Sequence, residues 1–224
     1  MPTRDLSPIP RSVPYTYVTW LSRVISGESQ CHYAGWFKTH FTFAKVARDA
    51  NLDAWAAAHT LMVHDAACDL KDGGYQVFLE EQNLVRVRGK GGAVLAGKPD
   101  IVAIKGDTAL VVECKTGEPR TRDTLQTRLY LHLLGEWSTH PARGCGRILG
   151  EVRYDPEQAD AVHLPHAAAD GMAELVRRYM RVFLSPEPPV PVPSFRECRY
   201  CDLSKHLCPD RVEGEVQETE TNLF

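Results

Sequence analysis

Hydrophobic positions along the chain change their period several times, which predicts a succession of helices and strands. Helix-like spacing runs from Tyr17 to about Ala50, with a break at Ser26-Gly27, and then from about Leu52 to Leu70. Two further helical patterns lie in EPRTRDTLQTRLYLHLLGEW and AAADGMAELVRRYMRVFL. Alternating or short apolar runs predict strands in YQVFLEEQNLVRVRG, GKPDIVAIKGDTALVVECKTG, GRILGEVRYD and DAVHLP. This order predicts an α/β fold with a mixed central sheet flanked by helices.

The run GKPDIVAIKGDTALVVECKTG reads as a hairpin, because Gly106-Asp107 suits a two-residue type II′ turn. With that turn, Asp100 lies directly opposite Glu113 on the neighbouring strand. Lys115 lies two residues beyond Glu113 and therefore points to the same face of the sheet. The remaining positions are apolar on both faces, which is typical of a central strand pair.

Two carboxylates that face each other at the edge of a core repel, and a divalent cation between them removes the repulsion. A lysine beside the cation orients or deprotonates a water and stabilises developing negative charge. This arrangement suits hydrolysis of a phosphodiester. The simpler interpretation makes Asp100 a turn residue and Glu113 and Lys115 a solvated pair at a strand end, and a longer turn would shift the register.

These residues resemble the PD-(D/E)XK nuclease motif, with Pro99-Asp100 as its first half and Glu113-Cys114-Lys115 as its second. QTRLY, residues 126–130, resembles the Q-x-x-x-Y element of the RecB-like branch. The resemblance implies a restriction-endonuclease-like core and a nuclease that depends on Mg²⁺ or Mn²⁺. It implies that Lys115 serves the attacking water. The implied metal ligands are His59, Asp100, Glu113 and the backbone carbonyl of Cys114.

Gln126 and Tyr130 share a helix face at positions i and i+4, where they brace the site or contact DNA. The histidine ligand has two candidates, His59 and His64. Trp55, His59, Met62 and Ala66 follow helical spacing on one apolar stripe, whereas His64 lies on another face of the helix. We therefore choose His59.

The chain has seven cysteines, an odd number that argues against a framework of disulfides. Cys198, Cys201 and Cys208 have C-x2-C-x6-C spacing, and Cys31 is the expected fourth ligand. All four, or three of them with His206, would also satisfy a zinc site, and spacing does not separate zinc from a cluster. Cys68 and Cys145 are expected to be ordinary buried or half-buried thiols, and the Cys114 thiol to face the core.

One N-terminal cysteine and three C-terminal ones resemble the iron–sulfur nucleases of the RecB-like type, including the CRISPR-associated RecB-like exonuclease family and AddB-type subunits. The resemblance implies a 4Fe-4S cluster in a small helical module that joins the N- and C-terminal segments. The chain then divides into six parts: 1–16, disordered; 17–50, the helical N-terminal part of the module; 51–185, the nuclease core; 186–195, a Pro-rich spacer; 196–211, the C-terminal cysteine cluster; and 212–224, an acidic tail.

Composition changes this picture little. The 224 residues carry a net charge of −3, and the acidic tail accounts for it, so charge neither indicates nor excludes nucleic acid. The N-terminus lacks the apolar stretch of a signal peptide, and no apolar run is long enough to cross a bilayer, which favours the cytoplasm and no membrane partner. Arg120, Arg122 and Arg128 flank the expected site and are candidates for phosphate contacts.

The resemblance suggests an exonuclease that acts on single-stranded DNA or overhangs, in CRISPR adaptation or DNA recombination, with protein partners in a DNA-processing complex. A second hypothesis is an iron–sulfur or zinc DNA-binding subunit whose nuclease centre is unused. A third is restriction-like cleavage of duplex DNA, although no separate sequence-reading module is visible.

Overall fold

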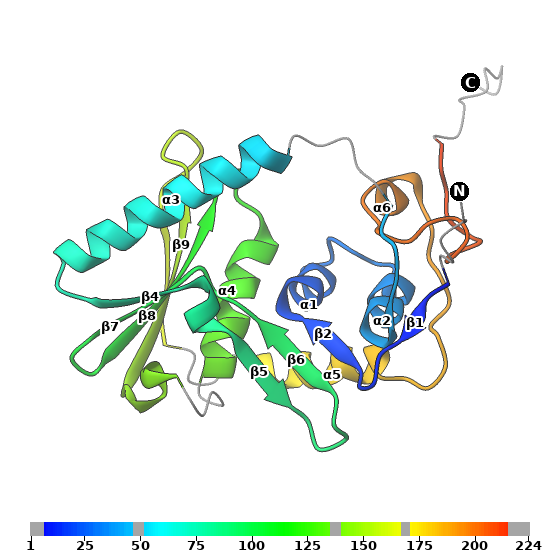
Figure 1. Cartoon of the computed structure of the whole chain (residues 1–224), viewed down its shortest axis with the longest axis horizontal. Helices are drawn as coiled ribbons and strands as arrows, with labels where there is room; N and C mark the ends of the chain where they lie inside the picture. The colour runs from blue at the N-terminus through cyan, green and yellow to red at the C-terminus, as the bar shows by residue number, and fades with distance from the viewer. Residues whose placement is uncertain (1–6, 47–51, 135–139, 167–170, 215–224) are drawn as a thin grey trace, which may run out of the picture.

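A mixed five-stranded sheet forms the centre of the protein (Figure 1). The computed structural model describes residues 7–46, 52–134, 140–166 and 171–214. The strand order is β10-β9-β8-β7-β4, and only β8 and β9 run parallel. The strands are β4 (Gln76–Leu79), β7 (Ile101–Lys105), β8 (Thr108–Lys115), β9 (Arg147–Tyr154) and β10 (Val162–Leu164). The sheet confirms the predicted mixed α/β class.

Two helices cover opposite faces of this sheet. Helix α3 (Leu52–Asp72) lies across one face of the sheet, as Figure 1 shows. Its Val63, Ala66 and Leu70 pack against residues of β7 and β8. Helix α4 (Thr121–Leu134) covers the other face, where its leucines join the larger core with residues of β7, β8 and β9. Alanine-rich α3 has high helix propensity and ends at Gly73-Gly74, where Gly74 has a φ of +80°.

A smaller sheet and two more helices extend the core of α4. Strand β6 (Val94–Gly97) lies between β2 (Tyr15–Tyr17), which is parallel to it, and β5 (Val85–Arg88), which is antiparallel. Helices α1 (Val18–Ile25) and α5 (Met172–Phe183) contribute to the same core. The expected break between the N-terminal helices at Ser26-Gly27 is confirmed, because α1 ends at Ile25.

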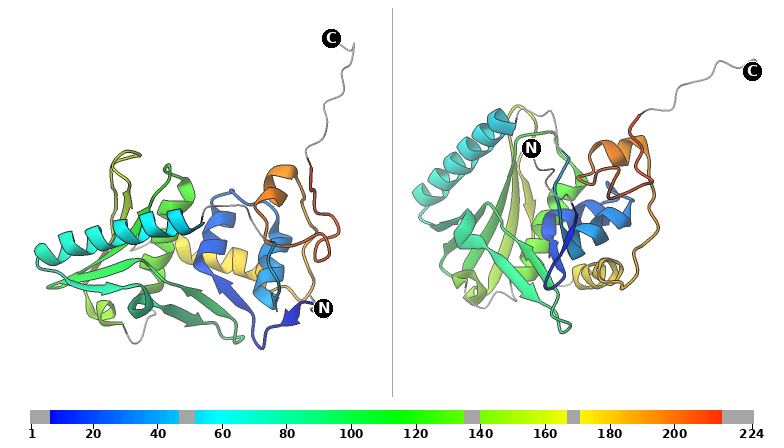
Figure 2. Two further views of the ribbon diagram at one scale, coloured as in Figure 1. Left: turned by 45° about the horizontal axis from the view of Figure 1, so that its top comes forward. Right: turned by 45° about the vertical axis from the view of Figure 1, so that its right-hand side comes forward.

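The two ends of the chain pack together on the side away from the large sheet (Figure 2). Helix α2 (His32–His40) and the segment that follows α6 (Phe195–Arg199) share a cluster that includes Phe37, Leu203 and Leu207. Tyr33 donates a hydrogen bond to the carbonyl of Leu207 at 3.0 Å, and the indole of Trp36 donates to the carbonyl of Ser185 at 2.8 Å. The partners of these bonds lie 174 and 149 residues apart in sequence.

Four expectations about secondary structure are wrong. We expected residues 1–16 to be disordered, but their described part forms β1 (Ile9–Pro10), which pairs with β3 (Phe41–Thr42), and most of β2. YQVFLEEQNLVRVRG is not one strand: a 3-10 turn at Glu80–Asn83 separates β4 from β5, which belong to different sheets. The helical pattern expected as far as about Ala50 ends at His40, where β3 begins; strand β6 was not predicted.

Two other predictions agree with the structure only in part. Cys68, expected to be at least half-buried, is exposed, because it lies on the outer face of α3 beside His64. The Pro-rich spacer predicted at 186–195 contains no helix or strand up to 194, and α6 begins at its last residue. Most of the acidic tail lies outside the described residues. Within those residues, no helix is both long and apolar enough to cross a membrane.

Candidate active site

The hairpin of β7 and β8 has the predicted register. Lys105 faces Thr108 and Ile101 faces Val112, so this register places Asp100, one residue before β7, opposite Glu113. Gly106 has a φ of +58° while Asp107 does not have a positive φ, as a type II′ turn requires. Across the pair, the backbone N–H of Cys114 donates to Oδ2 of Asp100 at 2.8 Å. The turn thus brings together two acidic residues that are 13 positions apart.

Glu113 is the most buried acidic residue of the site, with only 1% of its surface exposed. Its Oε2 accepts hydrogen bonds from Nζ of Lys115 at 2.9 Å and from Nε2 of Gln126 at 2.8 Å. The Lys115 ammonium also donates to Oε1 of Gln126 at 3.4 Å. The three side chains therefore form a closed triangle in which Gln126 of α4 fixes the Glu113 carboxylate.

The other oxygen of this carboxylate, Oε1 of Glu113, is buried without a hydrogen-bond partner. Burial, followed by the nearby Asp100 carboxylate, raises the pKa of Glu113 from 4.5 to about 7. Burial lowers the pKa of Lys115, but the charges of Glu113 and Asp100 outweigh it, so the pKa of the ammonium is raised overall. The site is thus short of positive charge at Glu113, which fits a cation bound between the two carboxylates.

His59 lies at this site and His64 does not. Nε2 of His59 is 3.4 Å from Oδ2 of Asp100, and this contact raises the pKa of the imidazole. His64 is exposed and pairs with Asp65 at 3.6 Å. The choice of His59 from the apolar stripe is therefore consistent with its position beside Asp100.

His59 and Lys115 act as the counter-ions of the two carboxylates in this arrangement. Among the residues that the structure describes, no three His, Cys, Asp or Glu side chains converge as ligands of one ion. The donor set of His59, Asp100 and Glu113 still suits Mg²⁺ or Mn²⁺, because two of its members are carboxylates and one carboxylate oxygen is unpartnered. A bound cation would exchange the contacts of His59 and Lys115 for its own.

Tyr130 braces the strand that leads into Asp100. Its side chain is 2% exposed, and its hydroxyl accepts a hydrogen bond from the backbone N–H of Lys98 at 3.3 Å. Burial, and then the charge of Glu113, raises the pKa of Tyr130 well above its usual range, so the phenol stays protonated. A Cβ added at Gly97 would lie 2.5 Å from the Tyr130 ring, so the ring needs glycine at this point. Tyr130 is thus a buried support.

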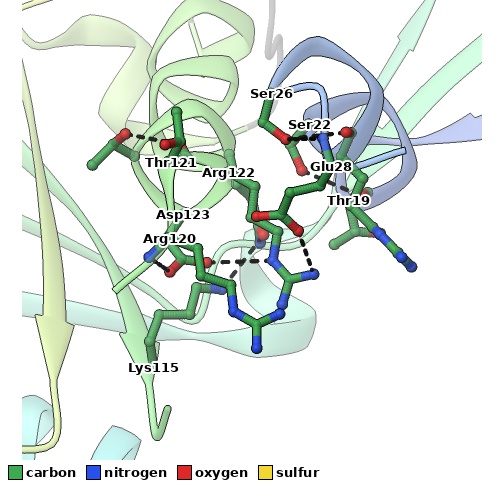
Figure 3. A network of polar contacts seen from close by, with 12 residues as sticks. Thr19, Ser22, Ser26, Glu28, Lys115, Arg120, Thr121, Arg122 and Asp123 are labelled. Atoms are coloured by element: carbon green, nitrogen blue, oxygen red, sulfur yellow. Dashed lines mark hydrogen bonds and ion pairs between the residues drawn. The ribbon is translucent and has the colours of Figure 1, made fainter. Parts of the chain in front are cut away.

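The first turn of α4 and α1 form the opposite wall of the site (Figure 3). Asp123 accepts a hydrogen bond from the backbone N–H of Arg120 at 3.0 Å, which caps α4. Arg122 pairs with Glu28, in the loop after α1, at 3.1 Å. Asp123 was expected as a candidate cap of this helix, and the structure confirms that role, but its place in the wall of the site was not predicted. Nothing in the sequence pointed to Glu28.

These walls enclose a cleft of about 590 Å³. Its lining includes all the predicted side chains of the site, together with basic residues of α1 and α4 and an exposed indole of α3. The lining residues include Trp55, His59, Asp100, Glu113, Lys115, Gln126, Tyr130, Arg23, Arg120 and Arg122. Arg128, our third candidate for phosphate contact, is not among the lining residues. Sequence analysis placed Trp55 on an apolar stripe but did not predict that it would line the cleft.

The motif and its geometry agree with a comparison of families. The model of the PD-(D/E)XK nuclease superfamily matches residues 17–209. The chain belongs to this superfamily. Among solved structures, the crystal structure of SSO0001 is similar, with 18% sequence identity and a TM-score of 0.48. The match covers 91% of this chain and 89% of that chain. None of the curated proteins is a match for this chain.

Outside the PD-(D/E)XK motif, the four predicted cysteines line one cavity, although no three of the described cysteines converge at the distances of ligands of one ion. Cys31, Cys198, Cys201 and Cys208 line one cavity of about 40 Å³, which we call the cysteine cavity. Cys198 and Cys208 are buried, and burial, together with the other three cysteines, raises the pKa of the Cys208 thiol. His206 is exposed and is not among the lining residues. Cys114 points into the core beneath α3, as predicted, and Cys145 is half-buried.

Basic side chains also line the cysteine cavity, namely Arg23, Lys38 and Arg211. Arg211 donates to the backbone carbonyl of Cys201 at 3.2 Å. Burial lowers the pKa of Lys38, whose ammonium lies 3.9 Å from Asp202 and against the ring of Trp20. Four thiols surrounded by cations favour a group of negative charge, and thiolates that hold a metal carry such charge.

Proposed function

We propose that the protein is a deoxyribonuclease that depends on Mg²⁺ or Mn²⁺ and acts in the cleft between α3 and α4. The observation that carries this proposal is the buried Glu113 carboxylate, with one unpartnered oxygen, opposite Asp100 and bonded to Lys115. His59, Asp100, Glu113 and the carbonyl of Cys114 would hold the metal. When bound, the metal would neutralise the carboxylates and supply Lewis-acid chemistry at the phosphodiester.

The chain's own residues have distinct tasks in this proposal. Lys115, beside Glu113, would serve the attacking water and stabilise the negative charge that develops on the phosphate oxygens. Gln126 fixes both Glu113 and Lys115, and Tyr130 fixes the backbone at Lys98. The arginines of α1 and α4 lie along the same cleft, where they would bind the DNA backbone.

We further propose a 4Fe-4S cluster in the cysteine cavity, with a structural role. Support comes from the four thiols of one cavity, the cations around them and the two chain ends that meet there. Anaerobically purified protein should be brown, with broad visible absorbance and about four iron atoms per chain. A colourless protein with stoichiometric zinc would instead indicate a zinc site formed by the same cysteines.

The substrate that we propose is single-stranded DNA or an overhang, cut from an end, as CRISPR adaptation or recombination would require. The test compares labelled single-stranded and duplex DNA, linear and circular, with Mg²⁺ or Mn²⁺. We expect cleavage of linear single strands and overhangs, and little cleavage of circles. Cleavage of circular DNA at the rate of linear DNA would instead indicate an endonuclease.

A catalytic variant separates cleavage from binding. Lys115→Ala should abolish cleavage and keep DNA binding, whereas His64→Ala, on the exposed face of α3, should change neither. If the wild-type protein binds DNA but never cuts it with either metal, the protein is a DNA-binding subunit with an unused nuclease centre.

A further inference from the structure

Trp55 is a large aromatic side chain that is exposed to solvent. It lies in the first turn of α3, with 57% of its surface exposed, and lines the same cleft as Asp100, Glu113 and Lys115. Met62 and Ala66, its companions on the helical stripe, pack toward the sheet. Trp55 precedes them along α3, beyond the buried part of the stripe. Tryptophan side chains are highly buried on average, so an exposed indole in a cleft is a candidate for contact with a ligand.

The Trp55 ring is held in a fixed orientation by its neighbour. It stacks on the imidazole of His59, with ring centroids 5.5 Å apart and an angle of 21° between the planes. His59 is in turn held by Asp100 at 3.4 Å. A chain of contacts therefore leads from the carboxylate to the exposed indole, which is oriented before any substrate binds.

We propose that Trp55 is a stacking platform for a nucleotide base beside the cleaved phosphate, an inference that rests on the proposed nuclease function. The π-face of an indole accepts any base, and such stacking contributes to binding without reading sequence. The cleft provides complementary walls, because Arg23, Arg120 and Arg122 also line it, while Trp55 offers an apolar ring. Figure 3 shows Arg120 and Arg122 at the start of α4, near Lys115.

The platform would select an unpaired nucleotide. A base inside a duplex is covered on both faces by its neighbours, so it must leave the stack before it contacts an aromatic side chain. A base in a single strand or at a frayed end has a free face. Trp55 is thus a substrate-positioning residue, and it would favour unpaired DNA without any sequence preference.

The experiment measures DNA affinity in a Lys115→Ala background, which keeps the substrate intact during the measurement. Fluorescence anisotropy follows binding of a labelled single-stranded oligonucleotide to Trp55→Ala, Trp55→Phe and Leu61→Ala. Leu61 is the matched control, since it is 62% exposed on the same helix but does not line the cleft. We expect Trp55→Ala to weaken binding about tenfold, Trp55→Phe to retain most of the affinity and Leu61→Ala to retain all of it.

Abasic oligonucleotides then identify the partner of the ring. One base is removed at successive positions, and each oligonucleotide is tested with the protein that keeps Trp55 and with the Trp55→Ala variant. We expect a position near the cleavage site where base removal weakens binding about tenfold when Trp55 is present but has no further effect on Trp55→Ala. If the two losses add at every position, Trp55 does not stack on a base and the proposal is wrong.

A structural role in bracing His59 makes a different prediction. In that case Trp55→Ala would weaken the binding of Mn²⁺ alone, measured by calorimetry without DNA, and the abasic losses would be additive. We expect Mn²⁺ binding to be unchanged. In the cleaving protein, Trp55→Ala should raise KM about tenfold with kcat nearly unchanged, and a loss confined to kcat would overturn the proposal.

This test is separate from that of the nuclease function. If the protein never cuts DNA but the non-additive abasic position is found, the stacking platform stands and the nuclease function fails. If the protein cuts DNA and no such position is found, the nuclease function stands and the platform fails.

Discussion

The nuclease centre and the cysteine cavity are built in opposite ways. At the nuclease centre, one hairpin of 16 residues supplies both carboxylates and the lysine, and a two-residue turn sets their distance. At the cysteine cavity, Cys31 meets cysteines that lie more than 160 residues later in the chain. The first site is thus organised by local structure, and the second by the packing of remote segments.

The charges around the two sites also differ. The carboxylates of the nuclease centre are desolvated and repel, so that site lacks positive charge. The thiols of the cysteine cavity are surrounded by Arg23, Lys38 and Arg211. We infer that a metal at the first site mainly serves chemistry, whereas a cluster at the second mainly serves the folding of the chain ends. Each prediction below tests one side of this difference.

The largest effect is expected at the nuclease centre. Glu113→Gln preserves the size of the side chain but removes the charge that would hold the metal. Because Lewis-acid stabilisation is worth several kcal/mol, cleavage should fall by about 10²–10⁴-fold. The iron content should not change, because none of the four cysteines of the cysteine cavity lines the cleft. A variant that cleaves at the wild-type rate would break the assignment, as measured with a labelled oligonucleotide.

The metal-free protein should lose stability as the pH rises. Burial raises the pKa of Glu113 from 4.5 to about 7, so between these values the folded state binds more protons than the unfolded state. The free energy of unfolding should therefore fall from pH 4.5 to 7, by up to about 3 kcal/mol for this group. Urea unfolding in EDTA at several pH values measures this fall. Glu113→Gln is the control and should lack this component, so an equal fall in both proteins contradicts the prediction.

Loss of a cysteine should loosen the chain ends and spare the nuclease centre. Cys198→Ser should remove the bound iron and make residues 186–211 about tenfold more sensitive to limited proteolysis, because local opening would become easier there. Cys145→Ser, outside the cysteine cavity, is the matched control. Mn²⁺ binding at the nuclease centre should stay within about twofold of wild type. A variant that loses Mn²⁺ binding as completely as iron would show that the two sites form one unit.

The smallest effect concerns the loop between the sites. Glu28 pairs with Arg122 at the cleft, while the neighbouring Ser29 hydroxyl donates to Glu197, beside Cys198. Glu28→Gln should remove one of the two acidic partners of Arg122, since Asp123 stays 3.7 Å from its Nε. DNA affinity should improve about two- to threefold, because a partly exposed ion pair is worth under about 1 kcal/mol. The gain should shrink at high salt. Glu174→Gln, on α5, is the control, and an equal gain there would indicate a general charge effect.

The sequence was most informative where structure is local. The turn at Gly106-Asp107 allowed the register of β7 and β8 to be predicted, and with it the meeting of Asp100 and Glu113. Helical spacing separated His59 from His64, and the resemblance to the Q-x-x-x-Y element pointed to Gln126. In each case the distance in space follows from a few residues of regular backbone.

Prediction was poorest where a segment depends on a remote partner. Residues 15–17 form a strand only because β6 lies beside them, almost 80 positions later. The YQVFLEEQNLVRVRG run alternates throughout, but Glu80 adopts a φ of +36° and turns the chain from one sheet to the other. The exposure of Trp55 was equally hidden, since helical spacing does not reveal where the covering sheet ends.

The two-residue turn at Gly106-Asp107 makes the relative positions of Asp100, Glu113 and Lys115 depend on the length of the hairpin as well as on its sequence. One inserted residue there would rotate every later side chain of β8 to the other surface and leave Glu113 beneath α3. The residues that we expect to bind DNA lie outside this hairpin, on α3 and at the start of α4. A lengthened turn should therefore abolish metal binding, whereas a change at Trp55 or Arg122 should alter DNA affinity and leave the metal in place.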